Sequence, residues 1–291
     1  EPGEGEILLK TLLLALDPLI RFAIDETLIS GATHVGLGEV MFGPTVSRVV
    51  ASNHPGYAVG DIVEGRTGWR EYAVVAPDRS DYRGPPRKLD PALAPVSTAL
   101  GALGMPGQTA HACVIEIGRV QAGETVAISA AAGAVGTIAG QIAKILGARV
   151  VGIAGGPQKC AALLDLGFDG AANVGGEVTL TVLPLINRGG RMPLCGYIAY
   201  YGVGMEGPGP DHLPGFFRTI MAKGLEVRGF AGFMVGGQQA LQDIAGWIGE
   251  GRLRYPEAVV EGLEAAPAAF AGVFSGNSHV GKLLVRVARE D

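Results

Sequence analysis

A short glycine-containing segment has the residues that a nucleotide-binding turn needs. Ala131, Gly133 and Gly136 occupy the three positions of a G-x-G-x-x-G turn, with alanine in the first. A residue without a side chain lets the backbone approach a pyrophosphate closely, and the start of a helix adds N–H groups and a partial positive charge. The predicted cofactor-binding residues of this turn are Ala131, Gly133, Ala134, Val135 and Gly136.

The residues about 20 positions after such a turn discriminate between two cofactors. An NAD site usually has Asp or Glu there, which binds the ribose 2′-hydroxyl. Here Gly155 and Gly156 occupy that place, and Lys159 follows. A carboxylate would repel a 2′-phosphate, whereas a lysine attracts it. The sequence therefore predicts NADP(H) binding by Gly155, Gly156 and Lys159, with Gln158 and Arg149 as weaker helpers; the alternative is that Lys159 is only a solvated lysine of a helix start.

The elements around the turn follow the order strand, turn, helix, strand. Thr125–Ala130 is a short apolar run typical of a buried strand, Gly136–Leu146 has apolar residues at helical spacing, and Arg149–Ala154 is a second apolar run. A dinucleotide-binding fingerprint requires this context. Helical patterns at Thr109–Ile117, Leu213–Lys223 and Gln238–Gly249 extend the alternation, so the sequence predicts an α/β fold with a doubly wound parallel sheet.

The first hundred residues have a different character. Strand-like runs at Glu6–Leu14, Val46–Ala51 and Tyr72–Val75 are separated by Gly, Pro and Asp turns, and Ser97–Leu103 is predicted to be helical. This part is therefore expected to be a β-rich domain.

Length supports two domains, because 291 residues exceed the usual size of one. The predicted division is a β-rich domain over 1–104, a nucleotide-binding domain over 105–251, and a C-terminal part over 252–291 that returns to the first domain through the strand Lys282–Ala288.

The composition argues against several classes of protein. A net charge of −5 gives no support to nucleic-acid binding, and no apolar run is long enough to span a membrane. Three scattered cysteines and no visible signal peptide predict a cytoplasmic protein with reduced thiols. The five histidines show no ligand spacing with the cysteines, so no metal site is expected.

One junction does not fit a doubly wound sheet. The strand-like Gly167–Ala172 is followed at once by Asn173–Glu177, although a further parallel strand needs a crossover of a dozen or more residues. We therefore predict that a segment is absent between Ala172 and Asn173.

Several motifs together resemble one enzyme family over nearly the whole chain. They are Asp17-Pro18 with Arg21, Leu37–Met41, His54–Asp61, Thr67–Tyr72, Gly104–Ala110, Ala130–Gly136, Gly152–Cys160, Asn173–Glu177 and Gly281–Val287. This combination is similar to that of the zinc-independent medium-chain dehydrogenase/reductases, in the leukotriene B4 dehydrogenase, prostaglandin reductase and 2-alkenal (curcumin) reductase group.

The resemblance implies a GroES-like β-rich domain beside a Rossmann domain, often in a homodimer, with residues preceding Glu1. It also implies reduction of the C=C bond of α,β-unsaturated ketones and aldehydes by NADPH. Hydride adds to the β-carbon, and a hydrogen-bond donor stabilises the resulting enolate. Tyr201 is the candidate donor because it follows a sheet strand, where ligands of such sheets bind. Tyr197 and Tyr200 are rivals, and a purely structural tyrosine is the alternative.

Other site residues rest on the resemblance. The further cofactor-binding candidates are Thr109, Asn173, Gly175, Gly176, Cys195, Gly196 and Asn277. The substrate candidates are Arg21, Tyr72 and Met105. His279 stands where the family commonly has asparagine, which leaves open whether Asn277 or His279 makes the C-terminal cofactor contact.

Two other functions remain open from the sequence. One is an NADPH:quinone oxidoreductase, which would pass hydride to a quinone. The other is a non-catalytic NADPH-binding protein with a structural or sensing role, because a fold alone does not fix function.

Overall fold

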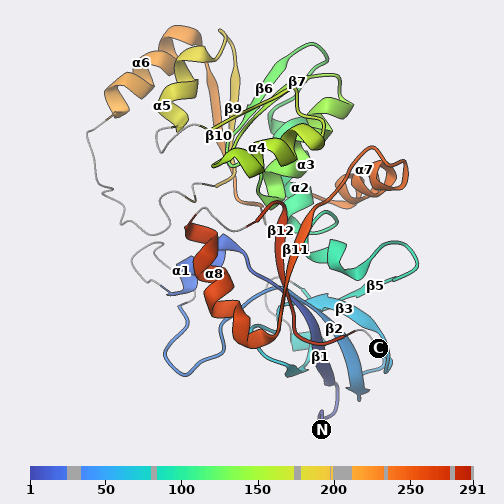
Figure 1. Cartoon of the computed structure of the whole chain (residues 1–291). Coiled ribbons are helices and arrows are strands. Elements are labelled where there is room, and N and C mark those ends of the chain that lie inside the picture. Colours follow the sequence, from blue (N-terminus) through green and yellow to red (C-terminus); the bar gives the residue numbers. More distant parts are fainter. Residues whose placement is uncertain are drawn as a thin grey trace. The chain divides into compact units, whose positions relative to one another are not determined.

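The computed structural model describes residues 1–24, 34–79, 84–173, 178–196, 198, 212–232, 235–275 and 279–289. The chain divides into two compact units (Figure 1). Unit 1 consists of Glu1–Leu100, Glu257–Ser278 and Leu283–Asp291, and unit 2 of Gly101–Pro256 and His279–Lys282. These divisions lie near those expected at 104 and 251, but the short segment His279–Lys282 belongs to unit 2.

Unit 1 is built on one sheet, in which the strands of the first hundred residues pair with one another in antiparallel fashion. In its described part the order is β11-β12-β1-β2-β3-β5, with β4 also pairing with β1. The strands are β1 (Ile7–Ala15), β2 (Thr45–Ser52), β3 (Ile62–Gly65), β4 (Tyr72–Val75), β5 (Arg87–Leu89), β11 (Glu257–Glu261) and β12 (Lys282–Arg286), and the α-helices are α1 (Arg21–Ile24) and α8 (Ala266–Phe274).

Strand β1 lies at the centre of this sheet. Leu12, Leu13 and Leu14 are all buried, which explains why its sequence is a continuous apolar run instead of an alternating one. The C-terminal strand β12 pairs with the second half of β1, with Leu14 opposite Val285. The two ends of the sequence therefore meet in one sheet.

Unit 2 alternates strands and helices (Figure 1). Its strands are β6 (Thr125–Ile128), β7 (Arg149–Ile153), β8 (Gly170–Ala172), β9 (Arg191–Leu194) and β10 (Glu226–Gly229), and its α-helices are α2 (Met105–His111), α3 (Ala134–Ile145), α4 (Pro157–Asp165), α5 (Val178–Val182), α6 (Leu213–Lys223) and α7 (Gln238–Gly249). The strand pairs among its described residues are all parallel, so the predicted α/β fold class is confirmed.

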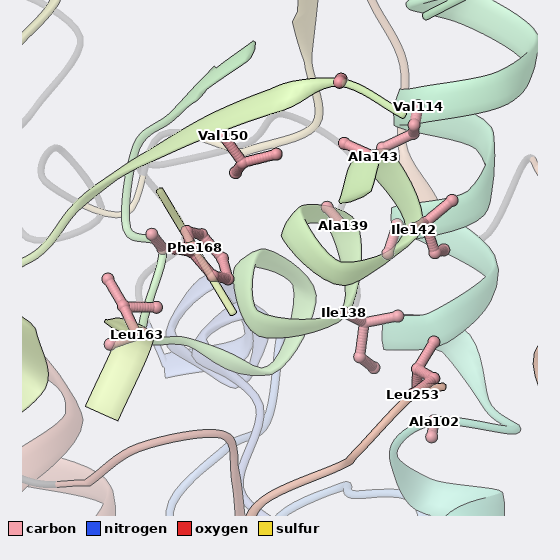
Figure 2. Packing of buried hydrophobic residues seen from close by; sticks show 14 of the residues in the cluster. Ala102, Val114, Ile138, Ala139, Ile142, Ala143, Val150, Leu163, Phe168 and Leu253 are labelled. Carbon is pink, nitrogen blue, oxygen red and sulfur yellow. The ribbon is translucent and has the colours of Figure 1, made fainter. Parts of the chain in front are cut away.

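Helix α3 forms the centre of the core of unit 2 (Figure 2). Ile138, Ala139 and Ile142 are buried at helical spacing. One side of the helix faces Phe168, whose ring would lie 1.9 Å from a Cβ atom on Gly140. A glycine is therefore needed for this close approach of helix and ring.

The parallel strands of unit 2 form two separate groups, β6-β7-β8 and β9-β10. The usual order of a doubly wound sheet is 3-2-1-4-5-6. The two groups match strands 3-2-1 and 5-6, which leaves the fourth position without a strand among the described residues. Thr125 and Ala127 of β6 are exposed, unlike the residues of a typical central strand. The absence of a segment after Ala172 stays a prediction.

Ion pairs connect the amino ends of the two groups. Arg191 at the start of β9 pairs with Glu124, which precedes β6. Arg119 pairs with Glu226 at the start of β10. These contacts link the groups at one end, although the described strands of the two groups share no ladder.

Two predicted helices differ from the structure. The helix expected over Ser97–Leu103 is a 3₁₀ helix over Val96–Leu100. The helix expected over Thr109–Ile117 already begins at Met105, because Pro106 is well suited to a first helical turn, and it changes to a π-helix at Ala112–Ile117. None of the helices in the described residues is both long and apolar enough to cross a membrane.

Candidate functional site

The glycine turn joins β6 to α3. The N–H of Ala131 donates a hydrogen bond to the carbonyl oxygen of Ile153 on β7 at 3.0 Å. The N–H of Gly133 donates to the carbonyl oxygen of Ala130 at 2.9 Å. Ala130 has φ of +48°, a left-handed conformation that is strained for a residue with a side chain. Gly133 is the N-cap of α3 and provides no side-chain cap. The N–H groups of the first turn of α3 have no intrahelical partner, which makes this end suitable for a phosphate.

The two glycines of the turn are required for different reasons. A Cβ atom on Gly136 would lie 2.6 Å from Cα of Ala131 and 2.7 Å from the Ala130 oxygen, so the packing of the turn itself excludes a side chain. A Cβ on Gly133 would meet only the Ala130 oxygen, at 3.2 Å. The absence of a side chain at Gly133 therefore matters more for an approaching ligand than for the fold.

The end of β7 leads into α4 through two glycines. A Cβ on Gly155 would have no atom within 4 Å, and Gly156 has φ of +84° at the N-cap of α4. Lys159 lies half-buried in the first turn of α4. The connection from Ile153 to Lys159 contains no carboxylate that could repel a 2′-phosphate.

A segment from the far end of the chain lies against the glycine turn. The N–H of Gly281 donates to the Ala132 carbonyl at 2.8 Å, and Gly281 forms a parallel bridge with Gly133. Gly281 has φ of +80°, and a Cβ there would lie 1.9 Å from the Pro256 oxygen. Only glycine therefore fits at this position, which fixes the path of the segment beside the turn.

His279 lies in this segment, two residues before Gly281. Its Nδ1 is buried and has no hydrogen-bond partner among the described residues. Burial, followed by the positive charges of Lys159 and Lys282, lowers the pKa of His279 below its ordinary value. The sequence left the role of His279 open, and in the structure the charge of Lys159 acts on its ring.

Cys195 and Gly196 follow the carboxyl end of β9, where the ligands of such sheets bind. The thiol of Cys113 hydrogen-bonds to Cys195, which lowers the pKa of Cys195 to about 7 and raises that of Cys113. All three cysteines, the two named and Cys160, are free and only partly buried.

Thr109 lies on α2, and its side chain is already engaged. The residue is buried, and its hydroxyl donates to the Met105 carbonyl at 2.7 Å. At the end of α2, Nε2 of His111 lies 2.9 Å from Oδ2 of Asp243 on α7. This hydrogen bond lowers the pKa of Asp243 and joins the two helices. Cofactor contact by Thr109 remains a prediction.

The remaining candidates are distributed over both units. Asn173 is exposed directly after β8, and Met105 begins α2. Arg21 begins α1, and Tyr72 is half-exposed at the start of β4. Tyr201, Gly175, Gly176 and Asn277, with the rivals Tyr197 and Tyr200, lie outside the described residues.

The described residues also contain a further hollow, but no cluster of metal-binding side chains. An open hollow in unit 1 is lined by a group that includes Ile24, His34 and Met41, but by none of the candidate site residues. Within the described ranges, no group of three or more His, Cys, Asp or Glu side chains could hold a metal ion.

The sequence is similar to several known oxidoreductases. Residues 1–81 match the family described as the N-terminal domain of oxidoreductase. The chain is 38% identical over 318 positions to the NADPH-dependent curcumin reductase of Escherichia coli (strain K12), covering 100% of this chain and 90% of that protein. It is 36% identical over 310 positions to prostaglandin reductase 1 of Rattus norvegicus, covering 98% and 90%.

Solved structures of other oxidoreductases are also similar to this chain. The crystal structure of CurA in complex with NADPH from Vibrio vulnificus has a TM-score of 0.89 and 37% identity, covering 99% of this chain and 91% of that one. The Escherichia coli quinone oxidoreductase complexed with NADPH has a TM-score of 0.72 at 19% identity, covering 98% and 93%, and shares the fold.

The alignment with the curcumin reductase also bears on the interrupted sheet. It spans 318 positions, whereas this chain has 291 residues, so at least 318 − 291 = 27 positions have no counterpart here. A helix and a strand would fit in that length. The location of the gap after Ala172 remains a prediction.

Proposed function

Because the chain belongs to the zinc-independent medium-chain dehydrogenase/reductases, with curcumin and prostaglandin reductases among its relatives, we propose that it reduces the C=C bond of α,β-unsaturated ketones and aldehydes with NADPH. It is an NADP-dependent oxidoreductase. The observation that supports the proposal most strongly is Lys159 at the start of α4, in a connection without a carboxylate.

The described residues fit NADPH. The first turn of α3 presents N–H groups beside Gly133, where no side chain limits the approach of a pyrophosphate. Gly155 leaves open space after β7, and Lys159 supplies a positive charge for the 2′-phosphate. When bound, the cofactor supplies the hydride.

The chain's own part in the chemistry is to orient the substrate and to stabilise charge on its oxygen. Reduction at the β-carbon places negative charge on the carbonyl oxygen as an enolate. A donor aimed at that oxygen stabilises the transition state more than the ground state. We assign this role to Tyr201, because a phenol with a pKa near ~10 stays protonated at neutral pH and can donate. Arg21, Tyr72 and Met105 stay proposed substrate residues.

Tyr201→Phe tests this assignment. We expect kcat for an enone to fall by about 100-fold, the usual effect of removing one such donor, with an unchanged Kd for NADPH. Stopped-flow and steady-state assays would measure both quantities. Tyr57→Phe is the control, because the Tyr57 hydroxyl donates to Pro86 within unit 1. An unchanged kcat in Tyr201→Phe, with a loss in Tyr197→Phe or Tyr200→Phe, would move the role to a rival.

The proposed reaction is tested by following NADPH consumption and product identity with three substrates: a short 2-alkenal, a diarylheptanoid enone and a quinone. Reduction of the two unsaturated carbonyls at the C=C bond supports the proposal. Turnover of the quinone alone would indicate a quinone oxidoreductase instead. Saturable NADPH binding with no turnover would indicate a non-catalytic protein.

We also propose a homodimer in the cytoplasm, with a GroES-like unit over 1–104 and 252–291 and a Rossmann unit over 105–251. Leu213, Phe217 and Met221 support self-association, because they form an exposed apolar stripe at i, i+4 and i+8 on α6. Light scattering of the purified protein would determine the oligomeric state.

A further inference from the structure

We propose that Cys113 and Cys195 form a redox-sensitive pair, in which hydrogen peroxide converts the two thiols into a disulfide and thereby lowers the activity of the enzyme. The formation of the disulfide follows from the two cysteines alone. Its effect on activity rests on the proposed function, because it assumes that the segment after β9 contributes to the cofactor site.

The two cysteines belong to elements that pack against each other. Cys113 lies in the π-helix Ala112–Ile117, Cys195 directly follows β9, and the strand packs against this π-helix. Arg191 at the start of β9 donates a hydrogen bond to the carbonyl oxygen of Arg119 at 3.1 Å, which anchors the strand beside the end of the π-helix. The thiol of Cys113 hydrogen-bonds to Cys195, so the two sulfur atoms are neighbours across this contact.

The backbone on the Cys113 side is held firmly. The carbonyl oxygen of Cys113 accepts a hydrogen bond from the N–H of Gly118 at 2.9 Å, and Val114 is buried in the core cluster around α3 (Figure 2). Strand β9, by contrast, pairs only with β10 among the described strands, and each of its side chains is at least partly exposed. A bond between the two sulfur atoms therefore moves the end of β9 more than it moves the π-helix.

Both thiols are able to react with a small oxidant. Each cysteine is only partly buried, so peroxide can reach the pair from solvent. The hydrogen bond from Cys113 lowers the pKa of Cys195 to about 7, so a large part of Cys195 is thiolate at neutral pH. The thiolate is the form of cysteine that attacks peroxide, and the neighbouring Cys113 thiol is placed to complete the disulfide.

The oxidation takes two steps. The Cys195 thiolate attacks one oxygen of hydrogen peroxide, the O–O bond breaks, and hydroxide leaves while Cys195 becomes a sulfenic acid. The Cys113 sulfur then attacks the Cys195 sulfur, and the displaced hydroxide combines with the Cys113 proton to form water. With the proton that Cys195 released as it became a thiolate, two thiols and one peroxide give one disulfide and two water molecules. The two sulfur atoms are oxidised, and the peroxide is reduced.

The disulfide is expected to lower activity because it displaces the end of β9. A disulfide holds its sulfur atoms about 2.05 Å apart, well inside hydrogen-bond distance, so Cys195 is drawn towards the π-helix. Cys195 and Gly196 are proposed cofactor-binding residues at the carboxyl end of β9, where the ligands of such sheets bind. A misplacement of about 1 Å can cost about 100-fold in turnover, so we expect kcat to fall by about 10- to 100-fold.

The test treats the reduced protein with hydrogen peroxide and follows its thiols, its mass and kcat for an enone in the same samples. The three free thiols should fall to one, and digestion should yield a peptide in which Cys113 is linked to Cys195. The intact mass should fall by about 2 Da, because the two thiols lose their hydrogen atoms. Dithiothreitol should restore both the thiols and the kcat.

Two variants separate this pair from the third thiol. Cys113→Ser removes the second thiol, so the loss of mass should disappear, and Cys195 should instead be oxidised to a sulfinic acid that dithiothreitol does not reverse. Cys160→Ser is the matched control, because the Cys160 thiol donates to the carbonyl oxygen of Ala154 at 3.8 Å. This control should respond to peroxide as the parent does.

Three free thiols after peroxide treatment, or a disulfide that includes Cys160, would overturn the inference. A Cys113–Cys195 disulfide that leaves kcat unchanged would refute its effect on activity. If the reduced protein reduces no enone, the proposed function fails, whereas the thiol count and the linked peptide still decide whether the disulfide forms.

Discussion

Lys159→Glu is expected to weaken NADPH binding about 1,000-fold and to leave NADH binding within about threefold of the parent. A hydrogen bond between an amine and a phosphate contributes about 1.5–3 kcal/mol, and a carboxylate in its place adds repulsion. The lost hydrogen bond and the added repulsion together weaken the binding free energy by ~4 kcal/mol, which corresponds to about three orders of magnitude in Kd. NADH has a hydroxyl instead of the 2′-phosphate, and a carboxylate can accept a hydrogen bond from it.

The matched control is Arg218→Glu, which makes the same change in net charge on the exposed surface of α6. Its Kd for NADPH should equal that of the parent. Lys159→Ala should lie between the parent and Lys159→Glu, with a loss of about 10- to 100-fold. An equal loss of NADPH and NADH binding in Lys159→Glu would mean that the substitution damaged the turn, and an unchanged preference would show that Lys159 is a solvated lysine.

Gly136→Ala is expected to destabilise the fold and to remove cofactor binding together. The new Cβ would lie 2.6 Å from Cα of Ala131 and 2.7 Å from the oxygen atoms of Ala130 and Ala131, all of them backbone atoms. Backbone atoms in a packed turn cannot move aside as the end of a flexible side chain can. The free energy of unfolding is therefore expected to fall by about 2–3 kcal/mol. For a chain of this length that corresponds to a fall in Tm of roughly 4–10 °C.

Gly246→Ala provides the control for this prediction. Gly246 lies inside α7, and a Cβ there would have no atom within 4 Å. Alanine in a helix interior is more favourable than glycine by up to ~1 kcal/mol, so Tm should stay the same or rise slightly. Scanning calorimetry and NADPH titration of both variants would measure the effects. If Gly136→Ala kept the parent's Tm and Kd, the close packing of the turn would be refuted.

Local patterns predicted most of the elements around the site. The expected helices Leu213–Lys223 and Gln238–Gly249 and the strand Tyr72–Val75 have these bounds in the structure. The glycine turn also lies between a strand and a helix, as predicted. In each case the signal is short-range: a spacing of apolar residues, or a glycine that must allow close approach.

The long-range parts of the site could not be predicted in this way. The C-terminal segment that carries His279 is anchored to the glycine turn through Gly281, a contact between residues far apart in the sequence. The pairing of Cys195 with Cys113 also depends on where β9 lies. The sequence Gly281-Lys282 does not reveal which turn the glycine contacts. The resemblance to the family showed only that His279 differs from the asparagine that is common at its position.

One expectation from the sequence, that a segment is absent after Ala172, stays a prediction. The crossover rule indicated that too few residues follow Ala172. In the structure the described parallel strands form two groups, and Thr125 and Ala127 of β6 are exposed. Residues present in relatives and absent here would account for this arrangement.

The most direct test of the account is a comparison of the Kd values for NADPH and NADH, measured by calorimetry on the unmodified protein near pH 7. Lys159 at a site without a carboxylate predicts that NADPH binds at least about 10-fold more tightly than NADH. Equal affinities, or no binding of either cofactor, would contradict the account.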